Sequence, residues 1–147
     1  MNEKKKILHI CMTQYSDGWT YQENFLTKYH KILGLDVTIL TSQYCYKEGK
    51  LEKDERKEFW DINGNHVIRL AEKNRRIMEK IPRYVGFKGI LDGLNPDIIF
   101  LHGCQYIDSK VVAEYVENNS DIELFVDNHA DFSNSARNWI SLFFYTN

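Results

Sequence analysis

The stretch ILHICM, at Ile7–Met12, is apolar apart from one histidine and predicts a buried β-strand near the N-terminus. Three more short apolar runs have the same character, and they lie at Val37–Leu40, Asp97–Leu101 and Glu123–Val126. Such nearly continuous apolar strands are typical of a parallel sheet that is covered on both faces.

Helical patterns separate these strands along the chain. After the first strand, Thr20 and Glu23 have the spacing of a capping box, and Gly34 stands where a left-handed C-cap would end the helix. Between them, apolar residues at helical spacing predict an amphipathic helix: Tyr21, Phe25, Leu26, Tyr29, Ile32 and Leu33. Further helices are expected at Val85–Leu94, after Asp108, which could cap that helix, and near Ser133–Tyr145.

Two segments in the middle of the chain have other patterns. Tyr44–Lys57 is rich in charge and predicts a long, mobile loop. Asn63–Asn65, with a central glycine, lies between the strand-like runs Phe59–Ile62 and His66–Leu70 and predicts a hairpin.

Strands that alternate with helical crossovers predict the fold class. We expect one α/β domain over residues 1–147, with a doubly wound, mostly parallel, Rossmann-like sheet and helices on both of its faces.

Composition excludes several classes of protein. The formal net charge is -2, whereas a nucleic-acid-binding domain is usually strongly basic. The 3 cysteines have no short pairwise spacing, so the sequence favours reduced thiols and a cytoplasmic protein over a disulfide framework or a zinc site. Neither a signal peptide nor an apolar run long enough to span a membrane is evident.

One basic segment suggests a second location, peripheral to the inner face of the membrane. Its cationic residues alternate with apolar ones and could contact anionic lipid, although a solvated helix face is the alternative. These residues are Lys73, Arg75, Arg76, Lys80 and Arg83.

Polar residues follow each of the central strands. In an open parallel sheet, ligands bind outside the carboxyl ends of the strands, where the strand order reverses. We expect the first strand and the Asp97–Leu101 strand to flank that point. The residues that follow the strands there are substrate-binding candidates: Asp17, Gly18, Trp19, His102, Gly103, Asn128 and Asp131.

Two of the candidate residues carry specific chemistry. Gly18 precedes a helix N-terminus, where free N–H groups could hold a phosphate, although the glycine could equally serve a turn. His129 ends a strand and is the candidate catalytic residue, with a histidine satisfied by backbone groups as the alternative. Asp127, His129 and Asp131 alternate as metal ligands might, but we favour a helix cap at Asp131 or Ser133 and expect no metal.

The order of these motifs resembles that of the GT4-type (group 1) glycosyltransferases. The resemblance covers nearly the whole chain, including Asp17–Trp19. The other similar segments are Lys6–Ile10, Leu35–Thr41, Asn63–Leu70, Asn95–Gly103 and Asp127–His129.

The resemblance implies the N-terminal, acceptor-side domain of a GT-B enzyme that transfers sugar from a nucleotide-sugar with retention, without a cofactor or metal. Gly18 would approach the donor phosphates, and His129 would meet the transferred sugar or the acceptor, a polysaccharide or glycolipid precursor. The loop at Asp17–Trp19 has one glycine where the family commonly has two. The donor-binding C-terminal domain is absent from the chain, so we expect the isolated domain to be inactive.

Two other hypotheses remain open. The first is a stand-alone, flavodoxin-like binding or regulatory module. The second is a small hydrolase that uses Asp127, His129 and Asp131, although the chain has no G-x-S-x-G nucleophile motif.

Overall fold

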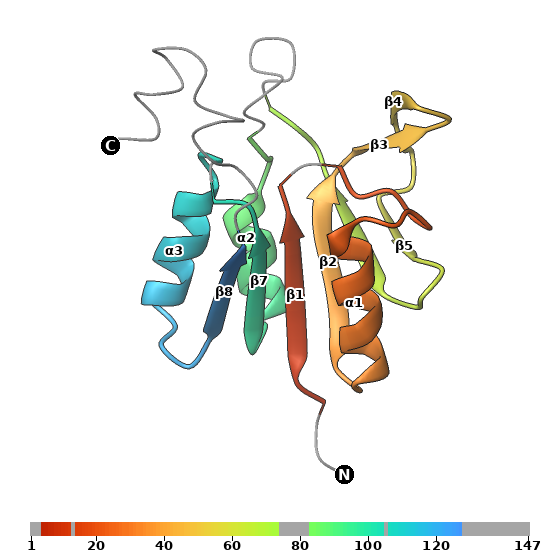
Figure 1. The fold of residues 1–147 in the computed structure, drawn as a ribbon. Coiled ribbons are helices and arrows are strands. Elements are labelled where there is room, and N and C mark those ends of the chain that lie inside the picture. Colours follow the sequence, from red (N-terminus) through yellow and green to blue (C-terminus); the bar gives the residue numbers. More distant parts are fainter. Residues whose placement is uncertain (1–3, 13, 74–82, 105, 128–147) are drawn as a thin grey trace, which may run out of the picture.

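The computed structural model describes the chain except for residues 1–3, 13, 74–82, 105 and 128–147 (Figure 1). Its centre is a mixed, mostly parallel sheet with the strand order β5-β6-β2-β1-β7-β8. The strands of this sheet are β1 (Lys6–Cys11), β2 (Asp36–Ser42), β5 (Glu58–Trp60), β6 (His66–Leu70), β7 (Ile98–His102) and β8 (Glu123–Asp127). The described helices are α1 (Gln22–Ile32), α2 (Phe87–Leu94) and α3 (Ser109–Glu117). The class is therefore α/β, as predicted.

The four apolar runs of the sequence are confirmed as β1, β2, β7 and β8, each within two residues of its predicted ends. Within the part of this sheet that the structure describes, these strands and β6 pair in parallel, and only β5 is antiparallel to its neighbour. The β5–β6 hairpin is also as predicted, because Gly64 turns the chain with a φ of 74° that suits glycine.

Side chains of β1 point alternately to the two faces of the sheet. Leu8 and Ile10 join an apolar core with Leu91 of α2 and Val112 of α3. The neighbouring residues of β1 face the opposite side, which α1 covers (Figure 1). Helices therefore lie on both faces of the sheet in the described part of the chain.

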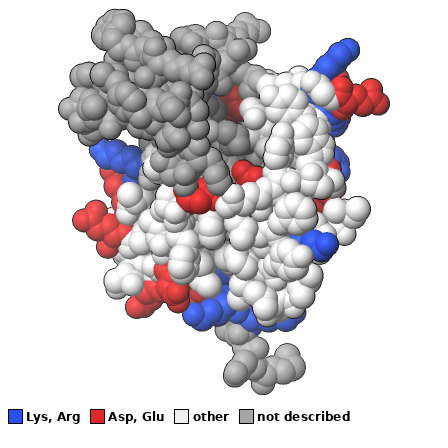
Figure 2. Space-filling view, in the orientation of Figure 1, with Lys and Arg blue, Asp and Glu red and all other residues white. Residues whose placement is uncertain are grey.

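Helix α1 packs with its polar side inward, opposite to what its apolar stripe suggests. Asn24 and Thr27 are its buried residues, and Asn24 donates a hydrogen bond to the backbone oxygen of Ser16. Five large apolar residues of the segment are instead exposed: Tyr21, Phe25, Tyr29, Ile32 and Leu33. The surface over α1 is accordingly largely uncharged (Figure 2). The reason is that the sheet face beneath α1 carries a polar residue, His9, that needs a hydrogen-bond partner.

The two ends of α1 differ in how well the sequence predicted them. The prediction of a capping box is wrong, because the helix begins after Tyr21 and no side chain caps its first turn. The C-cap is confirmed, since Gly34 has a φ of 89°. Its N–H donates to the oxygen of Lys31, and the next N–H, of Leu35, donates to the oxygen of His30. This is the Schellman arrangement that terminates helices.

Other predictions need correction. The segment predicted as a mobile loop contains an antiparallel hairpin of β3 (Tyr44–Lys47) and β4 (Lys50–Lys53). Asp108 does precede α3, but its carboxylate accepts a hydrogen bond from the N–H of Tyr84 instead of capping the helix. Helix α2 is confirmed near its predicted place. The predicted helix near Ser133–Tyr145 lies outside the described residues.

The basic segment is described only in part. Arg75, Arg76 and Lys80 lie outside the described residues, while Arg83 forms an ion pair with Asp108, with 3.3 Å between Nε and Oδ1. No helix in the described part of the chain has the length and apolar character that crossing a membrane requires.

The inverted packing of α1 makes a testable prediction. Leu91→Ala, at a side chain with 0% exposure, should lower the free energy of unfolding by about 2–5 kcal/mol, because it leaves a cavity in the core. Leu33→Ala, at 76% exposure, should change it by less than about 0.5 kcal/mol. Chemical denaturation measures both, and equal losses would mean that the α1 stripe is buried after all.

Candidate functional site

The carboxyl ends of the central strands meet at one rim of the sheet. β1 pairs with β2 on one side and β7 on the other, so the strand order reverses there, as predicted. The register aligns Cys11 with Thr41 and with His102, and His102 with Asp127. The loop after β1, which holds Gly18, leaves the sheet at the same rim. The sequence-predicted candidates Gly18 and His102 are thus brought to one edge.

The loop after β1 is fixed to its neighbours by hydrogen bonds. The N–H of Tyr15 donates to the Thr41 hydroxyl at 3.1 Å, and the Tyr15 hydroxyl donates to Asp61 at 2.7 Å. Asp17 accepts from the N–H of Ile62 at 3.1 Å, so its carboxylate is engaged by the β5–β6 turn. The rim loop is therefore a supported element of the site.

Gly18 has a clear structural role in this loop. Its φ is 76°, and a turn closes around it through the hydrogen bond from the N–H of Trp19 to the oxygen of Ser16. A Cβ at Gly18 would have no other atom within 4 Å. The backbone conformation thus accounts for the glycine, and the space beside it is open.

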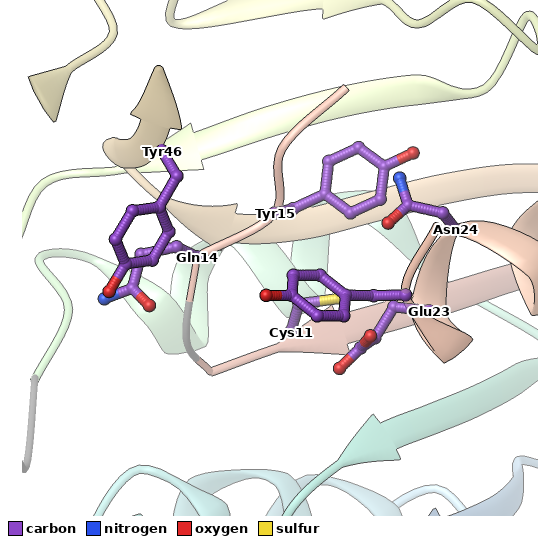
Figure 3. A pocket seen from close by; sticks show the side chains of 7 residues that line it. Cys11, Gln14, Tyr15, Glu23, Asn24 and Tyr46 are labelled. Atoms are coloured by element: carbon purple, nitrogen blue, oxygen red, sulfur yellow. The ribbon is translucent and has the colours of Figure 1, made fainter. Parts of the chain in front are cut away.

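A cavity of about 260 Å³ opens beside this rim (Figure 3). In the view of Figure 3, Gln14 and Tyr46 lie on one side of it and Asn24 and Glu23 of α1 on the other. The complete lining is Cys11, Gln14, Tyr15, Tyr21, Glu23, Asn24 and Tyr46. Burial raises the pKa of the Cys11 thiol, with Glu23 and Asp127 adding to the shift, so this cysteine stays protonated and is a poor nucleophile.

Aromatic rings form one wall of the cavity. Tyr21 and Tyr46 belong to the lining, and each packs against the ring of Trp19, which is not a lining residue, with ring centroids 5.3 Å and 5.7 Å away. Tyr46 belongs to the β3–β4 hairpin, which is the segment that the sequence pattern failed to identify as structured. The wall offers large apolar faces next to the amides and the carboxylate of the lining.

A buried ion cluster supports the rim from below. Arg69 of β6 donates to the backbone oxygens of Ser42 and Tyr15 at 3.0 Å and 3.1 Å. Its guanidinium also pairs with Asp54 at 3.2 Å, and Arg56 pairs with the same carboxylate at 2.7 Å. The hydrogen bonds from Arg56 and the charge of Arg69 hold the pKa of Asp54 well below its usual range. Sequence reasoning missed this cluster, because Arg69 of β6 is distant in sequence from Asp54 and Arg56, which share the loop before β5.

A chain of imidazoles crosses the sheet beneath α1. Nδ1 of His102 lies 2.9 Å from a carboxylate oxygen of Asp127, and Nε2 of His102 lies 2.9 Å from Nδ1 of His9. Nε2 of His9 lies 2.9 Å from Nδ1 of His30 on α1. We call Asp127, His102, His9 and His30 the histidine chain. The sequence indicated His102 only, although a histidine inside an apolar strand, as at His9, is itself a signal of a buried polar contact.

The surroundings disfavour positive charge on two of these rings. Burial lowers the pKa of His9 well below its usual value of 6.5, and the neighbouring imidazoles His102 and His30 add to the effect. Burial also lowers the pKa of His30, with His102 as the second cause. His9 is therefore neutral at neutral pH.

Several sequence-predicted site residues cannot be placed. Asn128, His129 and Asp131 lie outside the described residues. Gly103 does lie at the rim, where its N–H donates to Asp127 at 3.1 Å.

Within the described ranges, no group of three or more His, Cys, Asp or Glu side chains is arranged to hold a metal ion.

Comparison with known proteins gives no further guide to this site. No protein-family model, no curated protein and no solved structure matches the chain.

The neutral state of His9 makes stability depend on pH. Unfolded His9 binds a proton near pH 6.5, whereas folded His9 does so only at much lower pH, so acid favours the unfolded state. The free energy of unfolding should fall by up to about 1.4 kcal/mol per pH unit below that value for this one group. Denaturation at pH 5 and pH 8 should show a smaller difference for His9→Gln than for the wild type. An equal difference in both proteins would contradict the assignment.

The ion cluster makes a second prediction. Asp54→Asn leaves the buried Arg69 guanidinium without its counter-charge and should cost about 3–5 kcal/mol. Glu55→Gln is the matched control, because that side chain is 82% exposed and its loss should cost less than about 1 kcal/mol. Urea denaturation of the two variants distinguishes the cases. A small effect of Asp54→Asn would show that the cluster does not support the rim.

Proposed function

We propose that this chain is the N-terminal, acceptor-side domain of a retaining, nucleotide-sugar-dependent glycosyltransferase of the GT-B kind, acting on a polysaccharide or glycolipid precursor. The observation that carries the proposal is the cavity at the carboxyl-end rim, beside the point where the strand order reverses. Open α/β sheets bind their ligands at this position.

The strand order supports the finer fold assignment in this proposal. If the parallel strands are numbered along the chain, their order across the sheet is 3-2-1-4-5, given by β6, β2, β1, β7 and β8. This is the order of the doubly wound, Rossmann-like sheet. In such a sheet the loop after the first strand, here the loop with Gly18, faces the ligand.

The lining of the cavity supports a carbohydrate as ligand. A sugar ring presents hydroxyl groups, which need donors and acceptors, and a face of C–H groups, which packs against aromatic rings. The cavity offers both kinds of contact: Gln14, Asn24 and Glu23 for the hydroxyls, and Tyr21 and Tyr46 for the ring face.

The division of roles follows the resemblance. Gly18, with Asp17 and Trp19, would lie near the donor phosphates, and His102 and Gly103 would line the cleft. His129 would meet the transferred sugar or the acceptor, and Asn128 and Asp131 remain candidates for substrate binding. The donor itself would be held mainly by a second domain, so the proposal concerns binding by this chain and catalysis by a two-domain enzyme.

Binding of carbohydrate by the chain tests this proposal. Saturation-transfer NMR with a panel of oligosaccharides and nucleotide-sugars should identify at least one ligand. For that ligand, Tyr21→Ala or Tyr46→Ala should weaken binding about tenfold, equivalent to about 1.4 kcal/mol. Tyr29→Ala is the matched control, since Tyr29 is exposed on α1 and does not line the cavity.

Two outcomes would contradict the proposal. One is that no carbohydrate or nucleotide-sugar binds to the folded chain. The other is that Tyr29→Ala weakens binding as much as the two cavity variants do, which would place the ligand elsewhere.

A further inference from the structure

The histidine chain has a direction, which follows from the carboxylate at one end. An ionised carboxylate can only accept, so Nδ1 of His102 carries the proton of its contact with Asp127. Nε2 of His102 then accepts from Nδ1–H of His9, and Nε2 of His9 accepts from Nδ1–H of His30. All three rings donate towards Asp127, and the last lone pair is on Nε2 of His30.

The two ends of the chain lie in different environments. His30 is partly exposed on α1, and no described residue forms a hydrogen bond with its Nε2. At the other end, Asp127 also accepts hydrogen bonds from the N–H of Gly103 at 3.1 Å and from the Gln22 amide at 3.4 Å. The chain thus runs from a ring nitrogen near the surface to a carboxylate at the rim.

We propose that the histidine chain is a proton relay that carries a proton from His30 to the carboxyl-end rim at Asp127. A proton binds Nε2 of His30, and His30 passes its Nδ1 proton to Nε2 of His9. His9 passes its own Nδ1 proton to Nε2 of His102, which becomes an imidazolium beside the Asp127 carboxylate. Each transfer breaks one N–H bond and forms another, so the relay needs no co-reactant.

The charges around the relay favour a proton on His102, at the end of the relay next to Asp127. Of the three rings, His102 is the one that directly contacts a carboxylate, whereas burial disfavours a positive charge on His9. The elements packed around His9 contribute few other charges. Phe100 of β7 stacks on its ring at 5.4 Å, Cys11 on the same face of β1 is a neutral thiol, and Glu23 of α1 lies at the cavity. A proton that enters at His30 is therefore most stable on His102.

The relay ends next to the candidate site. Strand pairing places Cys11, which lines the cavity, beside His102, and places His102 beside Asp127. A proton delivered there could neutralise an anionic oxygen of a bound ligand, such as a phosphate or an alkoxide. The relay goes beyond the proposed function, because it requires no sugar and can be tested without one.

NMR of the chain with ¹⁵N-labelled histidine tests the relay. At high pH, His102, His9 and His30 should all be Nδ1–H tautomers, although free imidazole side chains prefer the proton on Nε2. On acidification, the first imidazolium should appear on buried His102, and the signals of all three rings should shift along one common curve. His30→Phe keeps a ring of similar size but offers His9 neither a donor nor an acceptor, so charging His102 would leave the Nε2–H of His9 without a partner. It should lower the midpoint of His102 by at least about one pH unit, tenfold in proton affinity.

A histidine outside the histidine chain provides the control for this experiment. His66→Gln removes an imidazole outside the histidine chain and should leave the three curves unchanged. The relay would be refuted if the first imidazolium formed on His30 and stayed there, if the rings titrated independently, or if His30→Phe left the His102 curve unchanged. If a variant does not fold, the tautomers of the wild-type protein still test the relay. An Nε2–H tautomer at His9 would exclude it.

Discussion

The parallel pairing of β1 with β2 on one side and β7 on the other is the constraint on which this structure depends. Backbone hydrogen bonds fix the register, so Cys11 pairs with Thr41 on one side and with His102 on the other. The rim, the cavity and the histidine chain all follow from that alignment. A slip of one residue would turn every side chain of β1 to the opposite face and separate His9 from His102.

The polar character of one sheet face explains the unusual orientation of α1. A buried imidazole at His9 without a partner would cost several kcal/mol, on the order of the penalty for any unsatisfied polar group. Turning Asn24, Thr27 and His30 inward satisfies the loop backbone and the imidazole, and it leaves the apolar side of the helix in contact with solvent. Polar satisfaction has thus outweighed apolar burial in this helix.

The cavity and the histidine chain share elements without sharing side chains. Both lie between α1 and the carboxyl ends of the strands, where strand pairing places Cys11 of the cavity beside His102 of the histidine chain. The aromatic wall of the cavity comes from the loop before α1 and the β3–β4 hairpin, which the ion cluster around Arg69 helps to hold. Ligand contact and proton movement can therefore be altered separately by substitution, and this separation makes the two proposals independent.

The sequence by itself determined the class of the fold and the local turns. Apolar runs specified the four central strands, and the positive φ required at Gly34 and Gly64 specified a helix end and a hairpin, because these features depend on residues a few positions apart. Of the site, it indicated the rim with Gly18 and His102. Only the tertiary structure decided which face of α1 is buried and that His102 meets His9. Those contacts join side chains from distant parts of the chain, and their distances are set by strand register and by the hydrogen-bond demand of buried polar groups, which no local pattern encodes.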